Sequence, residues 1–202
     1  MDEEIRKAGD YTIIHSLHIG DREVVLGENQ ENQDGQKFMC AFCTSNWLFA
    51  RYDDVLTSDD YPEIVTVYGQ RIAEQAEKTR VDLSKPKFQG IPNAPLTEKD
   101  CTPISYNDDL NGKIIVIKPD VLRREYRMAT QQIKLCTGGF GASPNSRGSA
   151  CCCVDLYSGK ESRFERVDVL GTLEQEQLPE WAKLGLVEYR QKQQKSKEQG
   201  AR

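Results

Sequence analysis

The sequence has no long hydrophobic run and no leader-like start. It contains no stretch of about eighteen consecutive apolar residues, so nothing in it predicts a transmembrane helix. Its first residues, Met1-Asp2-Glu3-Glu4, are acidic and lack the basic and then apolar order of a secretory signal peptide. Both absences favour a cytoplasmic protein that does not enter a membrane.

Histidine is scarce, and the motifs of common enzyme classes are missing. The two histidines, His15 and His18, lie in a run that alternates as a β-strand does. The chain has no Gly-x-Ser-x-Gly, His-Glu-x-x-His or Walker pattern. A cysteine nucleophile needs a partner base, and no spacing marks one out. We therefore predict a protein that is not an enzyme and that uses no cofactor.

The chain does have enough apolar residues for a core, and its charge is unevenly distributed. Hydrophobic residues make up 38% of it, which argues against wholesale disorder. The net charge is −5, but residues 1–110 hold 11 Lys and Arg against 21 Asp and Glu, whereas residues 111–202 hold 16 against 11. This asymmetry indicates either charged partners or two ordinary solvated surfaces that attract each other.

Strand-like runs and one helix account for the first part of the chain. Gly20-Asp21 and Asp34-Gly35 are turn signals between three runs that favour β-strands, at residues 11–19, 23–27 and 37–44. Asp59 or Asp60 can cap a helix over residues 60–80, and Pro62 suits its first turn. The predicted apolar face of this helix consists of Ile64, Val65, Tyr68, Ile72 and Ala76.

The second part of the chain predicts another small sheet. A compact apolar strand at residues 113–118 opens it, and further strands follow at Ile133–Cys136, at Ala150–Leu156 and through Phe164, Val167 and Val169. Pro179 fits the start of a terminal helix whose candidate packing residues are Trp181, Leu184, Leu186 and Val187.

The sequence thus predicts an α+β protein with two small antiparallel sheet units, each with a packing helix. Residues 81–111 contain four prolines and no long apolar period, which is typical of an extended linker. The predicted division is an acidic unit at residues 1–80, this Pro-rich linker, and a basic unit with a terminal helix at residues 112–202.

The glycine-rich loop at residues 137–148 is a candidate binding site. Its glycines leave backbone N–H groups free to approach an anion, and Arg147 adds a fork of donors. Phe140 lies in the same loop. The alternative is a long hairpin connection whose glycines satisfy demanding turns, since the loop lacks the Lys-Ser/Thr end of a P-loop.

Charged residues supply the remaining candidates for partner binding. A basic face that contacts phosphates is predicted from Arg123, Arg124, Arg127, Arg163 and Arg166, although acidic residues are interleaved with them. Carboxylates that mimic a phosphate backbone towards a basic protein groove are predicted at Asp53, Asp54, Asp59 and Asp60. The alternative for these four is a role as turn residues and helix caps.

Seven cysteines raise the questions of disulfides and of metal binding. Neighbouring strand residues point to opposite faces, so Cys151-Cys152-Cys153 cannot form an ordinary disulfide set with one partner region, and most thiols are predicted to fill strands. Cys40 and Cys43 have the spacing that zinc and redox sites share, but on a regular strand they face opposite sides. We predict structural cysteines and no metal, with a metal or redox site as the alternative.

Six strings in the second half carry a resemblance: Tyr126-Arg127-Met128-Ala129-Thr130, Thr137-Gly138-Gly139-Phe140-Gly141, Ser146-Arg147-Gly148, Leu156-Tyr157-Ser158-Gly159-Lys160, Arg163-Phe164-Glu165-Arg166 and Leu178-Pro179-Glu180-Trp181-Ala182. With them the chain resembles accessory proteins of conjugative elements and phages in gut Firmicutes, over most of residues 111–187 and also near residues 39–45. Small acidic proteins of such elements include inhibitors of host defence, among them inhibitors of Cas9-type nucleases. The resemblance implies no catalytic residues.

Residues and resemblance together predict a non-enzymatic binding protein of a mobile genetic element that inhibits a host defence nuclease, with the Cas9–guide RNA complex as partner. A nuclease groove that holds nucleic acid is basic, so the acidic half can dock there. The alternative is a nucleic-acid-binding accessory protein of conjugative transfer or replication, in which the basic half binds and salt weakens the affinity.

Overall fold

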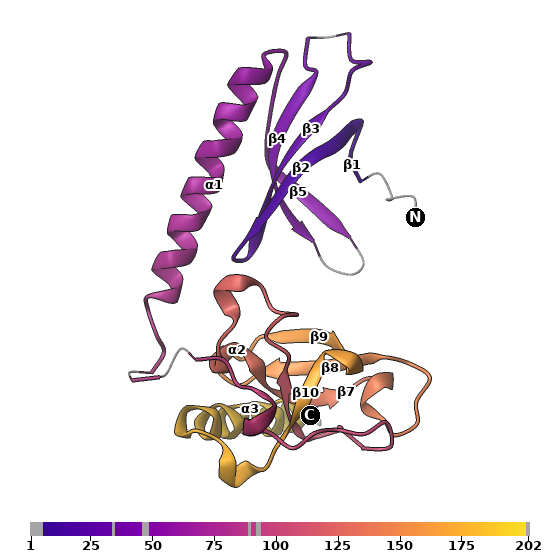
Figure 1. Ribbon diagram of the computed structural model, residues 1–202, viewed down its shortest axis with the longest axis vertical. Helices are drawn as coiled ribbons and strands as arrows, with labels where there is room; N and C mark the ends of the chain where they lie inside the picture. The colour runs from indigo at the N-terminus through magenta and orange to yellow at the C-terminus, as the bar shows by residue number, and fades with distance from the viewer. Residues whose placement is uncertain (1–5, 34, 46–48, 89, 92–93, 201–202) are drawn as a thin grey trace. The chain divides into compact units, whose positions relative to one another are not determined.

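The computed structural model of the protein describes residues 6–33, 35–45, 49–88, 90–91 and 94–200, with the backbone alone for residues 196–200. The chain divides into two compact units, Met1–Pro86 and Lys87–Arg202 (Figure 1). Each unit contains a five-stranded antiparallel sheet together with helix, so the predicted α+β class is confirmed.

The first unit is built on a sheet in which each strand pairs with the next one along the chain. Its strands are β1 (Lys7–Ala8), β2 (Tyr11–Ile19), β3 (Arg22–Glu28), β4 (Phe38–Ser45) and β5 (Ala50–Ser58). The alternating runs correctly predicted β2, β3 and β4, and Gly20, with a φ of +64°, makes the tight turn between the first two of these. The sequence did not predict β1 or β5.

Helix α1 (Tyr61–Leu83) covers one face of this sheet. Asp60 caps the helix, as predicted, because its carboxylate accepts a hydrogen bond from the Glu63 N–H at 3.3 Å. Apolar residues of α1 pack against Val24, Leu26 and Cys40 of the sheet, and these helix residues are Ile64, Val67, Tyr68 and Ile72.

The predicted apolar face of α1 was wrong at two exposed positions, Val65 and Ala76. Gln75 and Thr79 are buried instead. The Gln75 amide donates to the Ile19 carbonyl at 3.0 Å and to the Asp21 carboxylate at 2.9 Å. A polar side chain is therefore buried because it binds the β2–β3 turn, and helical periodicity does not reveal such a partner.

The opposite face of the same sheet has its own small core. Val25, Met39, Ala41 and Cys43 are almost completely buried there. Ala8 of the short strand β1 joins this cluster, and three partly buried residues pack around it, Tyr11, Ile13 and Tyr52. The sheet thus has an apolar interior on both faces, which explains why β3 reads as a nearly continuous apolar run.

The sheet of the second unit has the strand order β10-β6-β7-β8-β9. Its strands are β6 (Ile114–Ile117), β7 (Ile133–Gly138), β8 (Ala150–Asp155), β9 (Glu161–Glu165) and β10 (Val169–Leu173). The sequence predicted β6, β7 and β8, but it read β9 and β10 as one strand. They are two strands at opposite edges, since β9 pairs with β8 and β10 pairs with β6, and a turn of 3-10 helix (Arg166–Asp168) separates them in the chain.

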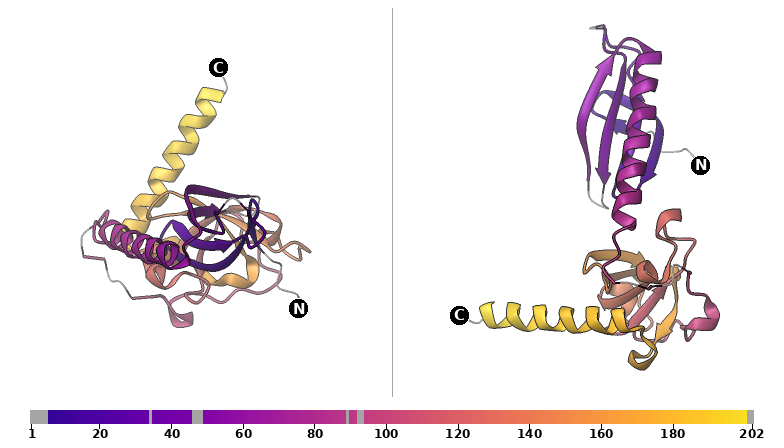
Figure 2. Two further views of the ribbon diagram at one scale, coloured as in Figure 1. Left: turned by 90° about the horizontal axis from the view of Figure 1, so that it is seen from above. Right: turned by 90° about the vertical axis from the view of Figure 1, so that its left-hand side faces the viewer.

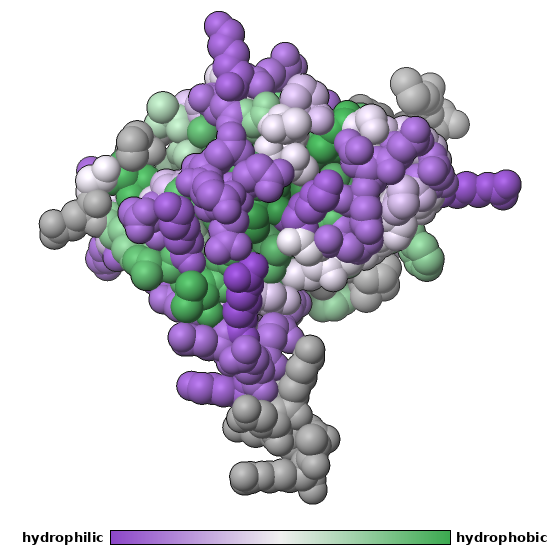
Figure 3. Space-filling model, turned by 90° about the horizontal axis from the view of Figure 1, so that it is seen from below, coloured by the Kyte–Doolittle hydropathy of each residue, from purple (hydrophilic) through white to green (hydrophobic). Residues whose placement is uncertain are grey.

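Helix α3 (Glu180–Gly200) packs on one face of this sheet through its first turns. Trp181 and Leu186 are buried there, as predicted, whereas Leu184 and Val187 are exposed. The later part of α3 projects beyond the sheet (Figure 2), and its surface is hydrophilic in Figure 3. Residues 190–195 are exposed throughout, in agreement with the prediction of a solvated helix end.

The segment after α1 belongs to the second unit and covers parts of both faces of its sheet. Phe88, Ile91 and Leu96 pack against the α3 side, and Leu110 is completely buried on the other side. The division therefore lies at Pro86 rather than across residues 81–111, because isolated apolar residues anchor the proline-rich segment where no regular period shows it. No helix in the described ranges is long and apolar enough to cross a membrane.

Candidate functional site

Two of the four predicted acidic residues lie in an unpredicted edge strand. Asp53 forms an ion pair with Arg51 along β5, with 2.8 Å between the Nε and Oδ1 atoms. Asp54 is exposed and has a φ of +52° at the irregularity where β5 shifts its register against β4. Asp53 and Asp54 are therefore strand residues. The alternative interpretation, which made them turn residues, does not hold for these two.

The other two acidic residues flank the start of α1. Asp60 is occupied as the helix cap. Asp59 is exposed and lines a hollow of about 790 Å³ together with Lys37, Gly35 and residues 30–33. The cap interpretation is thus right for Asp60, and exposed carboxylates without a cap role remain at Asp54 and Asp59.

The glycines of the loop after β7 are explained by close packing. A side chain on Gly139 would overlap the backbone of Ala150, and one on Gly141 would overlap the backbone of Ser149. Gly139 also has a φ of +101°, in the region that favours glycine. These glycines let the loop lie directly on the start of β8, as the hairpin alternative proposed.

The same loop nevertheless borders a pocket. Arg147 is exposed and forms part of a hollow of about 470 Å³, whose lining consists of Ile104, Ser105, Tyr106, Ser146, Arg147, Gly148, Ser149, Arg166 and Val167. Phe140 is 80% exposed and contacts Gly148 at the edge of this region. Of the eleven predicted partner-binding residues, the structure brings Arg147 and Arg166 into one pocket.

The two arginines of the pocket differ in how many of their hydrogen-bond donors are already used. Arg166 donates to the carbonyl oxygens of Gly141 at 2.6 Å, Ser105 at 2.8 Å and Asp108 at 2.6 Å. It therefore ties three segments together, and most of its donors are used. For Arg147, the described residues offer no hydrogen bond or ion pair, so its guanidinium is available to a ligand.

The remaining predicted arginines do not line this pocket. Arg127 donates to the carbonyls of Leu122 and Asp120 and so closes its own turn. Arg123 and Arg124 are exposed in the same segment after β6. Arg163 is exposed on β9, where it pairs with Cys152 of β8.

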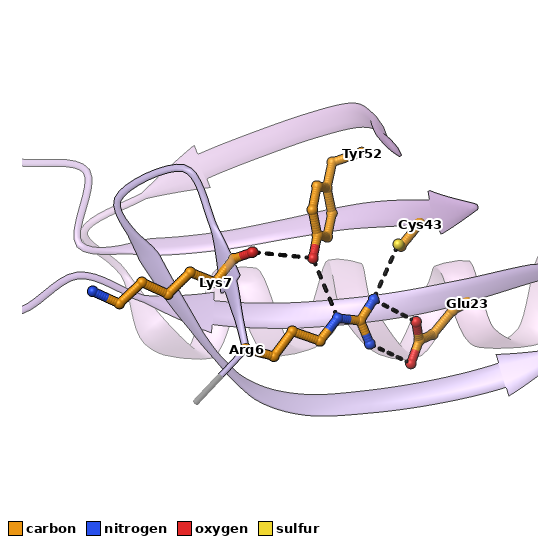
Figure 4. Close-up of polar contacts among 5 residues, drawn as sticks. All are labelled: Arg6, Lys7, Glu23, Cys43 and Tyr52. Carbon is orange, nitrogen blue, oxygen red and sulfur yellow. Dashed lines mark hydrogen bonds and ion pairs between the residues drawn. The ribbon is translucent and has the colours of Figure 1, made fainter. Parts of the chain in front are cut away.

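A polar cluster that the sequence did not predict lies in the first unit (Figure 4). The Arg6 guanidinium donates to both carboxylate oxygens of Glu23, at 2.9 and 2.7 Å, to the Tyr52 hydroxyl at 3.3 Å and to the Cys43 thiol at 3.0 Å. The Tyr52 hydroxyl donates in turn to the Lys7 carbonyl. This cluster fastens the chain before β1 to strands β3, β4 and β5.

Charge and burial act in opposite directions on the groups of this cluster. Burial raises the pKa of Glu23, but hydrogen bonds from Arg6 and Ser16 outweigh it, so that the pKa lies below its ordinary value. Burial raises the pKa of Cys43, which keeps the thiol protonated at neutral pH. The sequence contains one indication of this cluster: Glu23 lies near the start of the otherwise largely apolar strand β3, where a buried acidic side chain needs a partner.

A second unpredicted group is buried on the face of the second sheet that lies away from α3. Lys134 and Asp155 form an ion pair at 2.9 Å, and each side chain is only 5% exposed. Beside them are three buried thiols, Cys136, Cys151 and Cys153. Contact with Cys136, and then burial, raise the pKa of Cys151 and Cys153. Lys134 within an apolar run was the available signal.

The spacing of Cys40 and Cys43 does not make a ligand pair. Cys40 packs under α1 and Cys43 lies in the core of the opposite face, as predicted for a regular strand. His15 is on β2, and the described residues include no group of three or more His, Cys, Asp or Glu side chains placed to hold a metal ion. These cysteines are therefore core residues.

No protein family model, curated protein or solved structure matches this chain. The resemblance to mobile-element proteins stays a prediction that rests on its sequence strings. Two surfaces are candidates for binding: the exposed carboxylates Asp54 and Asp59 of the first unit, and the pocket beside Arg147 in the second unit.

Proposed function

We propose that this chain is a non-enzymatic binding protein whose acidic first unit docks on the basic, nucleic-acid-binding surface of a host defence nuclease, with the Cas9–guide RNA complex as the candidate partner. The observation that carries the proposal is that the first structural unit holds the chain's excess of negative charge. Residues 1–86 hold 9 Lys and Arg against 17 Asp and Glu, whereas residues 87–202 hold 18 against 15.

The exposed edge of the first sheet supplies carboxylates for such a contact. Asp54 on β5 and Asp59 directly after β5 are exposed, and neither serves as a helix cap. A surface with an excess of negative charge is attracted to a groove lined with lysine and arginine, and this attraction raises the association rate and suppresses wrong partners. Binding there excludes nucleic acid from the groove without any chemical step.

A plasmid-cleavage assay with purified Cas9 and guide RNA tests this proposal. The full-length protein in excess should reduce cleavage by at least one of several Cas9 orthologues. The double variant Asp54→Asn/Asp59→Asn should need about thirtyfold more protein for the same inhibition, since two lost surface contacts of about 1 kcal/mol each weaken binding by about 2 kcal/mol. Asparagine also tolerates the positive φ at position 54.

The matched control removes two negative charges from another part of the first unit. Glu74 and Asp82 are exposed on α1, and the variant Glu74→Gln/Asp82→Asn has the same net charge as the test variant. We expect this control to inhibit like the parent protein. Unchanged cleavage by all orthologues at excess protein would refute the proposal, and equal losses in both variants would show that net charge rather than the β5 edge is responsible.

A second candidate function is nucleic-acid binding by the second unit. It is favoured by the excess of positive charge after Pro86 and by the unengaged guanidinium of Arg147 at a pocket. Gel-shift titrations of single- and double-stranded DNA at two salt concentrations test it, because phosphate contacts make affinity fall steeply with salt. The absence of any shift at low salt would remove this candidate.

A further inference from the structure

The pocket beside Arg147 has walls that the chain holds in place. They come from residues 104–106, 146–149 and 166–167 of the second unit. The Tyr106 hydroxyl donates to the Ser146 carbonyl at 2.7 Å, and the Asn145 N–H donates to the Tyr106 carbonyl at 3.2 Å. Arg166 holds the Ser105 carbonyl at 2.8 Å. A ligand therefore meets walls that are already positioned, which lowers the entropy lost on binding.

The pocket presents positive charge and hydroxyl donors together. Arg147 has its donors available, and a guanidinium can bind two oxygens of a phosphate at once. Ser146 accepts from the Gly148 N–H at 3.2 Å through its hydroxyl oxygen, so its own proton remains free to donate. The nearby Asp108 carboxylate accepts a hydrogen bond from the Ser105 N–H at 2.7 Å through one of its oxygens, Oδ2.

The remaining wall is apolar and partly aromatic. Tyr106 is 58% exposed, and the bond of its hydroxyl to Ser146 fixes the direction of its ring. Val167 is 67% exposed, and Ile104 lies beside it in the lining. An exposed aromatic ring next to a guanidinium suits a ligand with a planar base and a phosphate, because bases stack on aromatic side chains and phosphates bind arginine.

We infer that this pocket binds one nucleotide unit of a single-stranded nucleic acid, with its phosphate on Arg147 and its base on the Tyr106 ring. The inference rests on the second proposed function and adds the site and the form of the ligand to it. A volume of about 470 Å³ holds one nucleotide rather than a duplex. Phe140, exposed at the border of the pocket, is positioned to contact a neighbouring base.

Fluorescence anisotropy with a labelled twelve-residue oligothymidylate tests this inference on the full-length protein. Arg147→Ala should raise the Kd about thirtyfold, and it should lower the steepness of the salt dependence by about one phosphate contact. Tyr106→Ala should raise the Kd about tenfold through lost stacking, whereas Tyr106→Phe keeps the ring and should bind within about threefold of the parent.

Arg190→Ala is the matched control, because it removes one exposed arginine of the same unit, on α3 and outside the pocket. It should change the Kd less than about threefold. Equal effects of Arg147→Ala and Arg190→Ala would overturn the pocket but leave nucleic-acid binding standing. No binding by the parent at low salt would overturn both. Melting curves check that each variant is folded. If Arg147→Ala is unstable, Arg147→Lys takes its place in the test; it keeps the charge but loses the forked donors, so it should bind more weakly than the parent.

Competition experiments test whether the pocket recognises both the base and the phosphate of a nucleotide. Thymidine 5′-monophosphate at millimolar concentration should displace the oligonucleotide, whereas inorganic phosphate at the same concentration should not, since it offers no base to Tyr106. Displacement by inorganic phosphate to the same extent would overturn the assignment of the base to the aromatic wall.

Discussion

Replacing Lys134 with methionine tests whether the buried ion pair of the second unit stabilises the fold. The Lys134 Nζ atom lies 2.9 Å from the Asp155 Oδ2 atom, and both side chains are 5% exposed. Methionine has a similar length but no charge, so the Asp155 carboxylate would remain buried without its cation. Removal of one partner from a buried pair costs about 3–5 kcal/mol.

The surroundings of Asp155 place the expected effect at the lower end of this range. The Asp155 Oδ1 atom still accepts hydrogen bonds from the N–H groups of Tyr157 at 2.8 Å and Ser158 at 2.7 Å. The Lys134 ammonium also lies 5.5 Å from the centre of the Phe164 ring, and the sulfur of methionine replaces part of that contact. We therefore expect a loss of about 3 kcal/mol in the stability of the second unit.

Native-state hydrogen exchange measured by mass spectrometry checks this prediction one unit at a time. A loss of about 3 kcal/mol corresponds to roughly a hundredfold faster exchange of the protected amides in β7 and β8. Peptides from β3 and β4 of the first unit serve as the internal control. The variant Lys134→Met/Asp155→Asn should recover at least half of the loss, because the asparagine oxygen can still accept from Tyr157 and Ser158 and no unpaired charge stays buried.

Two results would refute this reasoning. If Lys134→Met speeds the exchange of the β7 and β8 amides by less than about tenfold, water or a rearranged side chain compensates the charge of the Asp155 carboxylate. A double variant less stable than either single variant would mean that the two positions contribute by packing and not through their charges.

Three further predictions concern other parts of the chain. Because the pKa of Glu23 lies below its ordinary value of 4.5, its stabilising contribution is present above pH 4.5 and is lost as the pH falls through the lowered pKa. Glu23→Gln should therefore make the free energy of unfolding less dependent on pH on the acid side, as measured by hydrogen exchange of the β3 amides. Cys152 is the one cysteine of the seven that is exposed, so one thiol should react rapidly with Ellman's reagent in the native protein, and Cys152→Ser should abolish that phase. Gly185→Ala should lower the melting temperature, because the new methyl group overlaps the backbone of Leu156, whereas Gly69→Ala, in open space on α1, should stabilise by up to about 1 kcal/mol; a gain in both would refute the packing argument.

The sequence predicted the elements that have a regular strand pattern or a clear helix-cap signal. β2, β3 and β4 alternate cleanly or lie between glycine turns, and Asp60 with Pro62 marks the start of α1. β5 escaped prediction because the irregular pairing near Asp54 breaks its period of two and places acidic residues where turns are common.

The buried polar groups were beyond prediction for a different reason. Lys134 and Asp155 are 21 residues apart, and Arg6 and Glu23 are 17 apart, so their pairing depends on strand register. A charged residue inside an apolar run indicates that a partner exists, but it does not say which one. Register is fixed by the whole sheet, and local spacing carries no information about it.

The arginines of the second unit show the same limit for the candidate site. Sequence alone does not distinguish Arg147, which lies in the glycine loop, from Arg166, which directly follows β9, since both side chains suit phosphates. Arg166 differs because three backbone carbonyls, from residues 25, 58 and 61 positions away, accept its donors. An arginine whose donors are used in this way builds the wall of a pocket and adds only its charge to a ligand. Because the donors of Arg147 stay available at that wall, we expect recognition of an anion in this pocket to depend on Arg147.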